Sequence, residues 1–82
     1  MSKKINMLRE KIDLLDKKIV ELLKKRTNLA KEVIALKKEL NIGVEDTLRE
    51  KAIIGQLCKI EPEMSELIKD IYRRVFNWTK SR

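Results

Sequence analysis

The sequence contains no histidine and a single cysteine, Cys58. Without histidine the chain cannot offer imidazole as a general base, a Ser-His pair or a histidine-ligated metal site. One cysteine cannot form a disulfide within the chain or build a cysteine-rich zinc site. The lack of disulfides in so small a chain is typical of a reducing compartment, so we expect a cytoplasmic protein.

Glycine, proline and aromatic residues are scarce, with two Gly, one Pro and one each of Phe, Trp and Tyr among 82 residues. So few turn-forming residues exclude a small β-barrel and a glycine-rich nucleotide-binding fold. No apolar run approaches the roughly 18 residues of a membrane span, and the basic start lacks the apolar stretch of a secretory signal. The composition therefore predicts one all-α domain over residues 1–82, with no membrane partner.

Apolar residues in the first forty positions recur at spacings of three and four, which predicts one very long helix over about residues 5–41. We expect it to end around Asn41 to Gly43, where glycine can adopt the left-handed conformation that closes a helix. The residues of this apolar seam are Ile5, Leu8, Ile12, Leu15, Ile19, Leu22, Leu29, Val33, Leu36 and Leu40.

Two further helices are predicted, a short one over about residues 47–60 and a medium one over about 63–80. Thr47 and Glu50 have the spacing of a capping box, and Pro62 separates the two helices. In the short helix, the apolar positions expected to be buried are Ala52, Ile53, Leu57 and Ile60. In the medium helix, they are Met64, Ile68, Ile71, Val75 and Trp78, with Leu67 and Phe76 beside them.

The length of the first predicted helix argues for a second chain. At about 1.5 Å per residue, a helix over residues 5–41 spans about 55 Å, whereas a compact globule of this size is about 30 Å across. The two shorter helices can cover one of its faces at most, and each buried Leu or Ile is worth about 1.5–3 kcal/mol. We therefore expect an intertwined helical homodimer that buries the seam between two copies.

Twenty Lys and Arg residues against thirteen Asp and Glu residues give a net charge of +7, which favours an anionic partner. Arg26 interrupts the apolar seam, where an unpaired guanidinium would be costly. Lys37, about three helical turns later, faces the same way, and Arg49 and Glu50 flank the apolar face of the next helix. These inward-facing groups predict a pocket for a small polyanion, since Arg suits bidentate binding of carboxylates.

Arg26 also has a purely structural interpretation, in which it pairs with Glu50 or with a Glu of the partner chain and sets the register of the helices. The residues alone leave both interpretations open. Arg9 lies about 25 Å from Arg26 along the helix axis and cannot share its pocket in one chain. In an antiparallel dimer, Arg9 could reach the pocket of the partner.

A different class of function is a basic helical dimer that binds nucleic acid or a partner helix. Its basic residues should form an exposed stripe, and its binding should fall steeply with salt. Arg26 within the seam argues against this reading, because an Arg that contacts phosphate has no reason to face a core. Three aromatic residues also offer little for stacking on bases. We therefore expect no nucleic acid partner.

Several of these residues belong to a longer pattern. The pattern reads Leu8-Arg9-Glu10-Lys11-Ile12, Asp16, Leu22-Leu23-x-x-Arg26-x-x-Leu29-Ala30, Lys37 and Asp46-x-x-Arg49-Glu50. It resembles the all-helical class of chorismate mutases, closely over residues 5–60 and loosely over the last helix. The resemblance implies an intertwined dimer with two equivalent active sites that rearrange chorismate to prephenate, the step toward phenylalanine and tyrosine.

The resemblance also implies roles for four residues. Arg9 would come from the partner chain and, with Arg26, bind a substrate carboxylate. Lys37 would donate to the ether oxygen and contact a carboxylate. Glu50 would accept a hydrogen bond from the ring hydroxyl.

Three more residues complete the implied substrate site. Asp46 and Arg49 would line the same pocket. Thr79 falls where the family usually has a small hydroxyl residue that meets a carboxylate. The alternative for Thr79 is a hydroxyl at a helix end that is satisfied locally.

The pattern departs from the family one turn after Thr79, where the family usually has Gln or Glu against the ether oxygen. That position would be residue 83, just past Arg82. We expect either that Lys37 alone serves the ether oxygen or that catalysis is weaker. Shifting the alignment by one residue would put Arg82 there, but Trp78 would then replace the hydroxyl, so the first alignment is preferred.

The implied reaction is an intramolecular pericyclic shift, which needs no nucleophile, general base, metal or cofactor, and we expect none. It is helped by holding the substrate dianion in its reactive shape. It is also helped by cations placed where negative charge grows on the breaking C–O bond. An isochorismate-pyruvate lyase on the same scaffold would need the same cations and remains an alternative.

Overall fold

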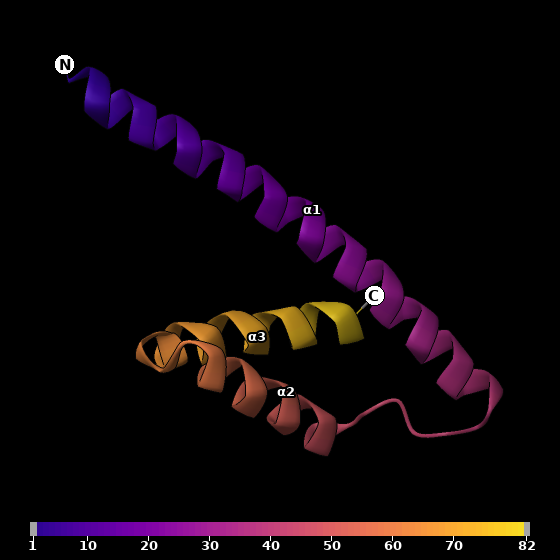
Figure 1. Ribbon diagram of the computed structural model, residues 1–82. Coiled ribbons are helices and arrows are strands. Elements are labelled where there is room, and N and C mark those ends of the chain that lie inside the picture. Colours follow the sequence, from indigo (N-terminus) through magenta and orange to yellow (C-terminus); the bar gives the residue numbers. More distant parts are fainter. Residues whose placement is uncertain (1, 82) are drawn as a thin grey trace. The chain divides into compact units, whose positions relative to one another are not determined.

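The computed structural model describes residues 2–81 (Figure 1). It contains helix α1 (Lys3–Glu39), helix α2 (Thr47–Ile60), a short 3-10 helix η1 (Pro62–Met64) and helix α3 (Ser65–Lys80). No strand occurs among the described residues, which confirms the prediction of an all-α chain with one very long, one short and one medium helix. Within the same residues, none of the helices combines the length and the apolar character that crossing a membrane requires.

The chain divides into two compact units, Met1–Ala30 and Lys31–Arg82. Among the residues of the first unit that the structure describes, one stretch of α1 is the only helix, so they include no second element against which it could pack. Its seam residues are accordingly about half exposed, from 47% for Ile5 to 63% for Leu29. The apolar seam predicted from the sequence is present, but a single helix cannot bury it within this unit.

The C-terminus of α1 is closed by Asn41, which takes a left-handed conformation with φ 58°. The Ile42 N–H donates to the Lys37 carbonyl at 2.8 Å, and the Asn41 N–H donates to the Lys38 carbonyl at 3.2 Å. These two bonds form a Schellman motif. The closing residue lies within the expected range of Asn41 to Gly43, but the expectation that Gly43 would take the left-handed conformation was wrong, because Asn also tolerates this region.

Helix α2 begins at Thr47, as predicted, but its cap is the preceding residue. The Asp46 side chain accepts a hydrogen bond from the Arg49 N–H at 3.0 Å. The capping box that the sequence predicted, with Thr47 as the cap, is therefore wrong by one position. Asp and Thr are both good caps, and a carboxylate also interacts favourably with the helix dipole.

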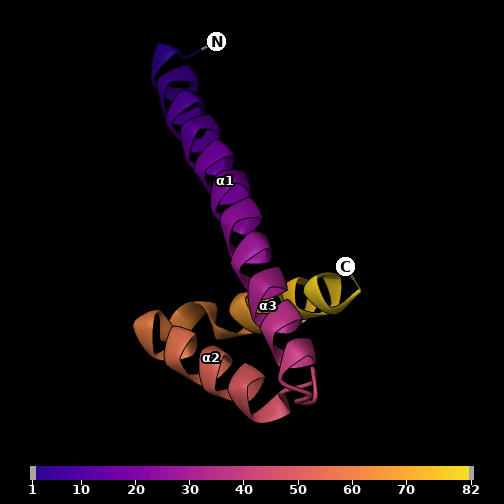
Figure 2. The same cartoon turned by 90° about the vertical axis from the view of Figure 1, so that its right-hand side faces the viewer.

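Pro62 separates α2 from α3 as expected, and it does so through the turn of 3-10 helix η1. The Ser65 hydroxyl donates to the Pro62 carbonyl at 2.7 Å. The medium helix therefore starts at Ser65 instead of residue 63. This tight connection lets α2 and α3 run side by side as a helical hairpin (Figures 1 and 2).

The core of the second unit lies between α2 and α3. Phe76 is only 7% exposed, and the ring of Tyr72, one turn earlier, meets it edge-on with the ring centroids 5.8 Å apart. The other apolar residues that are half-buried in these two helices are Ile53, Ile54, Leu57, Cys58, Ile68 and Val75.

The buried faces of α2 and α3 overlap the predicted ones but are turned relative to them. The predicted residues that are buried or half-buried are Ile53, Leu57, Ile68, Val75 and Phe76. Met64, Ile71 and Trp78 are 45–53% exposed in the chain, and Ile60 is 76% exposed. An amphipathic helix with two neighbouring apolar stripes can turn only one of them toward a single neighbour. In α3 that stripe is the one that carries the two rings of Tyr72 and Phe76.

Candidate active site

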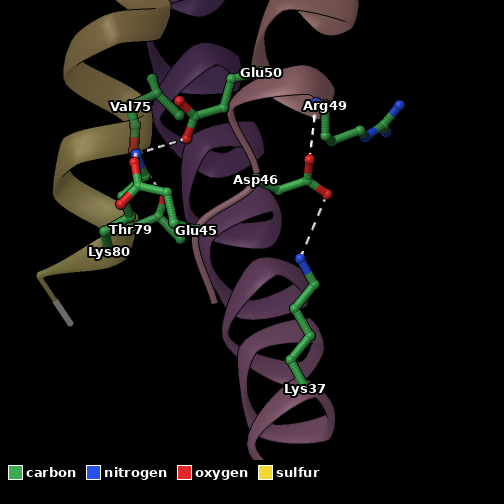
Figure 3. Close-up of polar contacts among 8 residues, drawn as sticks. All are labelled: Lys37, Glu45, Asp46, Arg49, Glu50, Val75, Thr79 and Lys80. Atoms are coloured by element: carbon green, nitrogen blue, oxygen red, sulfur yellow. Dashed lines mark hydrogen bonds and ion pairs between the residues drawn. The ribbon is translucent and has the colours of Figure 1, made fainter. Parts of the chain in front are cut away.

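Lys37 and Asp46 come together because the chain turns back after α1. The Schellman motif holds the Lys37 backbone carbonyl, and the connection that follows leads into α2. The Lys37 Nζ then lies 3.6 Å from the Asp46 Oδ2 (Figure 3). The side chains are 23% and 46% exposed, so this ion pair lies partly out of solvent.

The two carboxylate oxygens of Asp46 interact with two different helices, α1 and α2. Its Oδ1 caps α2 by accepting from the Arg49 N–H, while its Oδ2 faces the Lys37 ammonium (Figure 3). The carboxylate therefore has a fixed orientation before any ligand arrives. The position of the Lys37 ammonium is defined relative to the first turn of α2.

Glu50 meets the last turn of α3 through Lys80. The Lys80 Nζ lies 2.8 Å from the Glu50 Oε2 and 3.0 Å from the Glu45 Oε1 (Figure 3). The hydrogen bond with Glu50 is the largest of the effects that raise the pKa of Lys80 above its ordinary value, followed by the hydrogen bond with Glu45. Lys80 is therefore a fixed cation at neutral pH and a poor general base.

The other two predicted site residues of this unit lie nearby but are arranged differently. The Arg49 side chain is exposed and extends away from Glu50 and Lys80 (Figure 3). Thr79 is 6% exposed, and its hydroxyl donates to the Val75 carbonyl at 2.8 Å. This hydrogen bond within the helix matches the alternative given for Thr79, a helix-end hydroxyl that is satisfied locally. The hydroxyl oxygen still has lone pairs that can accept a hydrogen bond.

Arg9 and Arg26 belong to the first unit, as part of α1. Arg9 is exposed, and Arg26 is half-exposed. Arg82, which the shifted alignment would place in the site, lies outside the described residues. The predicted site residues of the second unit are Lys37, Asp46, Arg49, Glu50 and Thr79.

Glu45 and Lys80 were missed by the sequence reasoning. Lys80 is 30 residues from Glu50 and 35 from Glu45 in the sequence, and no local motif joins them. Their contact follows from the side-by-side packing of α2 and α3. The position of Lys80 directly after Thr79 is the one signal that could have pointed to it.

The arrangement suits binding and orientation more than proton transfer. Two ammonium groups and three carboxylates hold each other in defined positions around the N-terminus of α2. Among residues 2–81, no three Cys, Asp or Glu side chains gather in a way that could hold a metal ion. A set of fixed charges is what recognition of a polar, charged small molecule requires.

Comparison with known proteins identifies the family. The family model described as chorismate mutase type II matches residues 8–82, a range that contains every residue predicted for the site. No curated protein and no solved structure matches the chain. The resemblance read from the sequence is confirmed, and the chain belongs to the chorismate mutase type II family.

Proposed function

We propose that this chain is a homodimeric chorismate mutase that rearranges chorismate to prephenate in the cytoplasm, on the route to phenylalanine and tyrosine. The observation that carries the proposal is the family match over residues 8–82. The partner that it requires is a second copy of the chain. No cofactor enters the reaction, because the C–O bond breaks and the C–C bond forms in one pericyclic step.

The apolar seam of α1 supports the dimer. Seven seam residues of the first unit, from Ile5 to Leu29, are each about half exposed in the single chain. Covering one Leu or Ile side chain fully is worth about 1.5–3 kcal/mol. A second copy with the same seam is the natural cover, because a two-fold interface places the same surface on both sides.

The proposed roles follow the family pattern. Arg26 and the Arg9 of the partner chain bind a carboxylate of the substrate, and Lys37 donates to the ether oxygen. Glu50 accepts from the ring hydroxyl. The remaining residues of the site are Asp46, Arg49 and Thr79, which complete the binding of the substrate.

The chemistry requires that these groups act without moving protons. The ether C–O bond of the substrate breaks while a C–C bond forms in the same molecule, so no group enters or leaves. Binding the dianion in a compact shape brings the two reacting carbons together. Negative charge grows on the ether oxygen as the C–O bond breaks, and a cation that is already in place stabilises it.

Lys37 is well suited to this second task because its position is set beforehand. The Asp46 carboxylate that faces it is itself held by the Arg49 N–H at 3.0 Å. A donor fixed in this way needs little reorganisation when the transition state forms. The partial burial of Lys37, 23% exposed, strengthens its field relative to a fully solvated ammonium.

The test is the rate at which the purified protein consumes chorismate, followed by the loss of its ultraviolet absorbance. Wild-type protein should accelerate the loss over buffer. Lys37→Met should lower kcat by about 10²–10³-fold, the usual cost of one such donor. Lys69→Met is the matched control, because Lys69 pairs with the exposed Glu66 within α3. The control should keep the wild-type rate.

Identification of the product separates the closest alternatives. Prephenate from chorismate supports the mutase, whereas pyruvate released from isochorismate would show a lyase on the same scaffold. No acceleration by wild-type protein would end the mutase proposal. Binding to nucleic acid that weakens steeply with salt would then favour the basic helical dimer.

A further inference from the structure

Lys80 joins three separate segments of the chain at one point. It stands in the last turn of α3, and its ammonium group contacts Glu50 in the first turn of α2 and Glu45 in the segment before that helix (Figure 3). The distances of 2.8 and 3.0 Å are those of charge-assisted hydrogen bonds. Neither contact is local in sequence.

The contact with Glu50 is the stronger of the two. The Glu50 side chain is 24% exposed and the Lys80 side chain 30%, whereas the Glu45 side chain is 67% exposed. An ion pair that is partly shielded from water interacts more strongly than an exposed one. Lys80 is therefore directed chiefly at Glu50, and Glu45 helps to hold it from the solvent side.

The contact with Lys80 engages one of the two oxygens of the Glu50 carboxylate. Lys80 contacts Oε2, which leaves the lone pairs of Oε1 for another donor. It also removes the rotational freedom that a long acidic side chain would otherwise lose on binding a ligand. A ligand hydroxyl would thus meet an acceptor that is already oriented.

The contact also changes the local charge. A doubly negative substrate would be repelled by a bare Glu50 carboxylate close to its hydroxyl. The Lys80 ammonium at 2.8 Å offsets that charge while leaving the carboxylate able to accept. This second effect acts on the affinity for an anion and not on the shape of the protein.

From these contacts we infer that Lys80 is a positioning residue of the active site, which orients and electrostatically screens Glu50 so that Glu50 can accept the hydroxyl of a dianionic substrate. The inference rests on the proposed mutase function. It assigns to Lys80 a task that acts through Glu50 and needs no contact between Lys80 and the substrate.

The experiment compares kcat and KM for chorismate in wild-type protein, Lys80→Met and Lys80→Arg. Lys80→Met keeps most of the aliphatic stem and removes the charge, so KM should rise about tenfold, the effect of losing one hydrogen bond to a charged group. Lys80→Arg keeps the cation and should recover most of the loss. Lys69→Met, which removes a charge that pairs with Glu66 within α3, should leave KM unchanged.

The measurement of KM distinguishes a positioning role of Lys80 from a purely structural contact. If Lys80 only stabilised the fold, Lys80→Met would reduce the folded fraction and the apparent kcat, while the folded molecules would keep the wild-type KM. A double-mutant cycle with Glu50→Gln provides the second test. In the Glu50→Gln background, Lys80→Met should change KM by less than about twofold, because the group through which Lys80 acts has lost its charge.

Three outcomes would overturn the inference. An active wild-type protein whose Lys80→Met variant keeps the wild-type KM would refute the role of Lys80 and leave the mutase function standing. Equal effects of Lys80→Met with and without Glu50→Gln would show that Lys80 does not act through Glu50. A wild-type protein that does not consume chorismate would refute both the function and the inference.

Discussion

Replacing Asp46 separates two tasks that one carboxylate performs. Its Oδ1 caps α2 through the Arg49 N–H, and its Oδ2 faces the Lys37 ammonium at 3.6 Å. Asp46→Ala removes both interactions. Asp46→Asn keeps a side-chain oxygen that can cap the helix but removes the charge that faces Lys37.

The expected magnitudes follow from these two contacts. Loss of an N-cap costs about 1 kcal/mol, and a partly exposed ion pair adds at most about 1 kcal/mol. Asp46→Ala should therefore lower the free energy of unfolding by about 1–2 kcal/mol per chain, and Asp46→Asn by less than about 1 kcal/mol. Thr47→Ala should cost less than about 0.5 kcal/mol, because Thr47 is not the cap.

Urea unfolding measures these differences. With an unfolding slope of about 2 kcal/mol per molar, Asp46→Ala should move the midpoint down by about 0.5–1 M. All variants must be compared at one protein concentration, since the stability of the proposed dimer would depend on it. A shift for Thr47→Ala as large as that for Asp46→Ala would refute the assignment of the cap. Asp46→Asn should also lower kcat because it frees Lys37, and a wild-type kcat would contradict the role given to the ion pair.

Two further predictions concern the ends of α1 and α3. Asn41→Gly should be more stable than Asn41→Val by about 1–2 kcal/mol, because residue 41 has φ 58° and a β-branched residue is strained there. Equal midpoints of urea unfolding for the two variants would contradict this conformation. Hydrogen bonds with Glu50 and then Glu45 raise the pKa of Lys80 above its ordinary value. The stability that Lys80 contributes is therefore complete below the unfolded pKa of about 10.4. It is lost as the pH rises through the higher pKa of the folded state. The stability difference between wild-type protein and Lys80→Met should therefore be constant up to about pH 9 and smaller at about pH 11. Equal differences in urea unfolding at these two pH values would contradict the contact.

The helices were predictable because strong local signals mark them. The apolar period and the lack of Gly and Pro in the first forty residues predict α1, and Pro62 separates α2 from α3. The details at the helix ends were less predictable. Asp46 and Thr47 are adjacent good caps, and Asn41 and Gly43 are both able to close α1, so the sequence alone does not choose between them.

Which face of each short helix is buried depends on packing that the sequence does not encode locally. In α3, the stripe with Trp78 and the stripe with Phe76 are both apolar, and the structure buries Phe76. The site residues likewise include some that a local sequence pattern predicts and others that only helix packing brings together. Lys37 and Asp46 belong to a recognisable pattern and are found together, whereas Lys80 reaches Glu50 only because α3 packs beside α2.

Mixing two inactive variants tests most directly the claim that the active site is built from two chains. Arg9→Ala and Lys37→Ala each remove one group from both sites of a homodimer. In a mixed dimer of the proposed kind, the intact Arg9 of one chain and the intact Lys37 of the other would meet in one complete site, while the second site would lack both. If refolding a 1:1 mixture pairs chains at random, about half of the dimers are mixed, so the mixture should regain about one quarter of the wild-type rate. A mixture of folded, dimeric chains that consumes chorismate no faster than the two variants refolded separately would contradict the account.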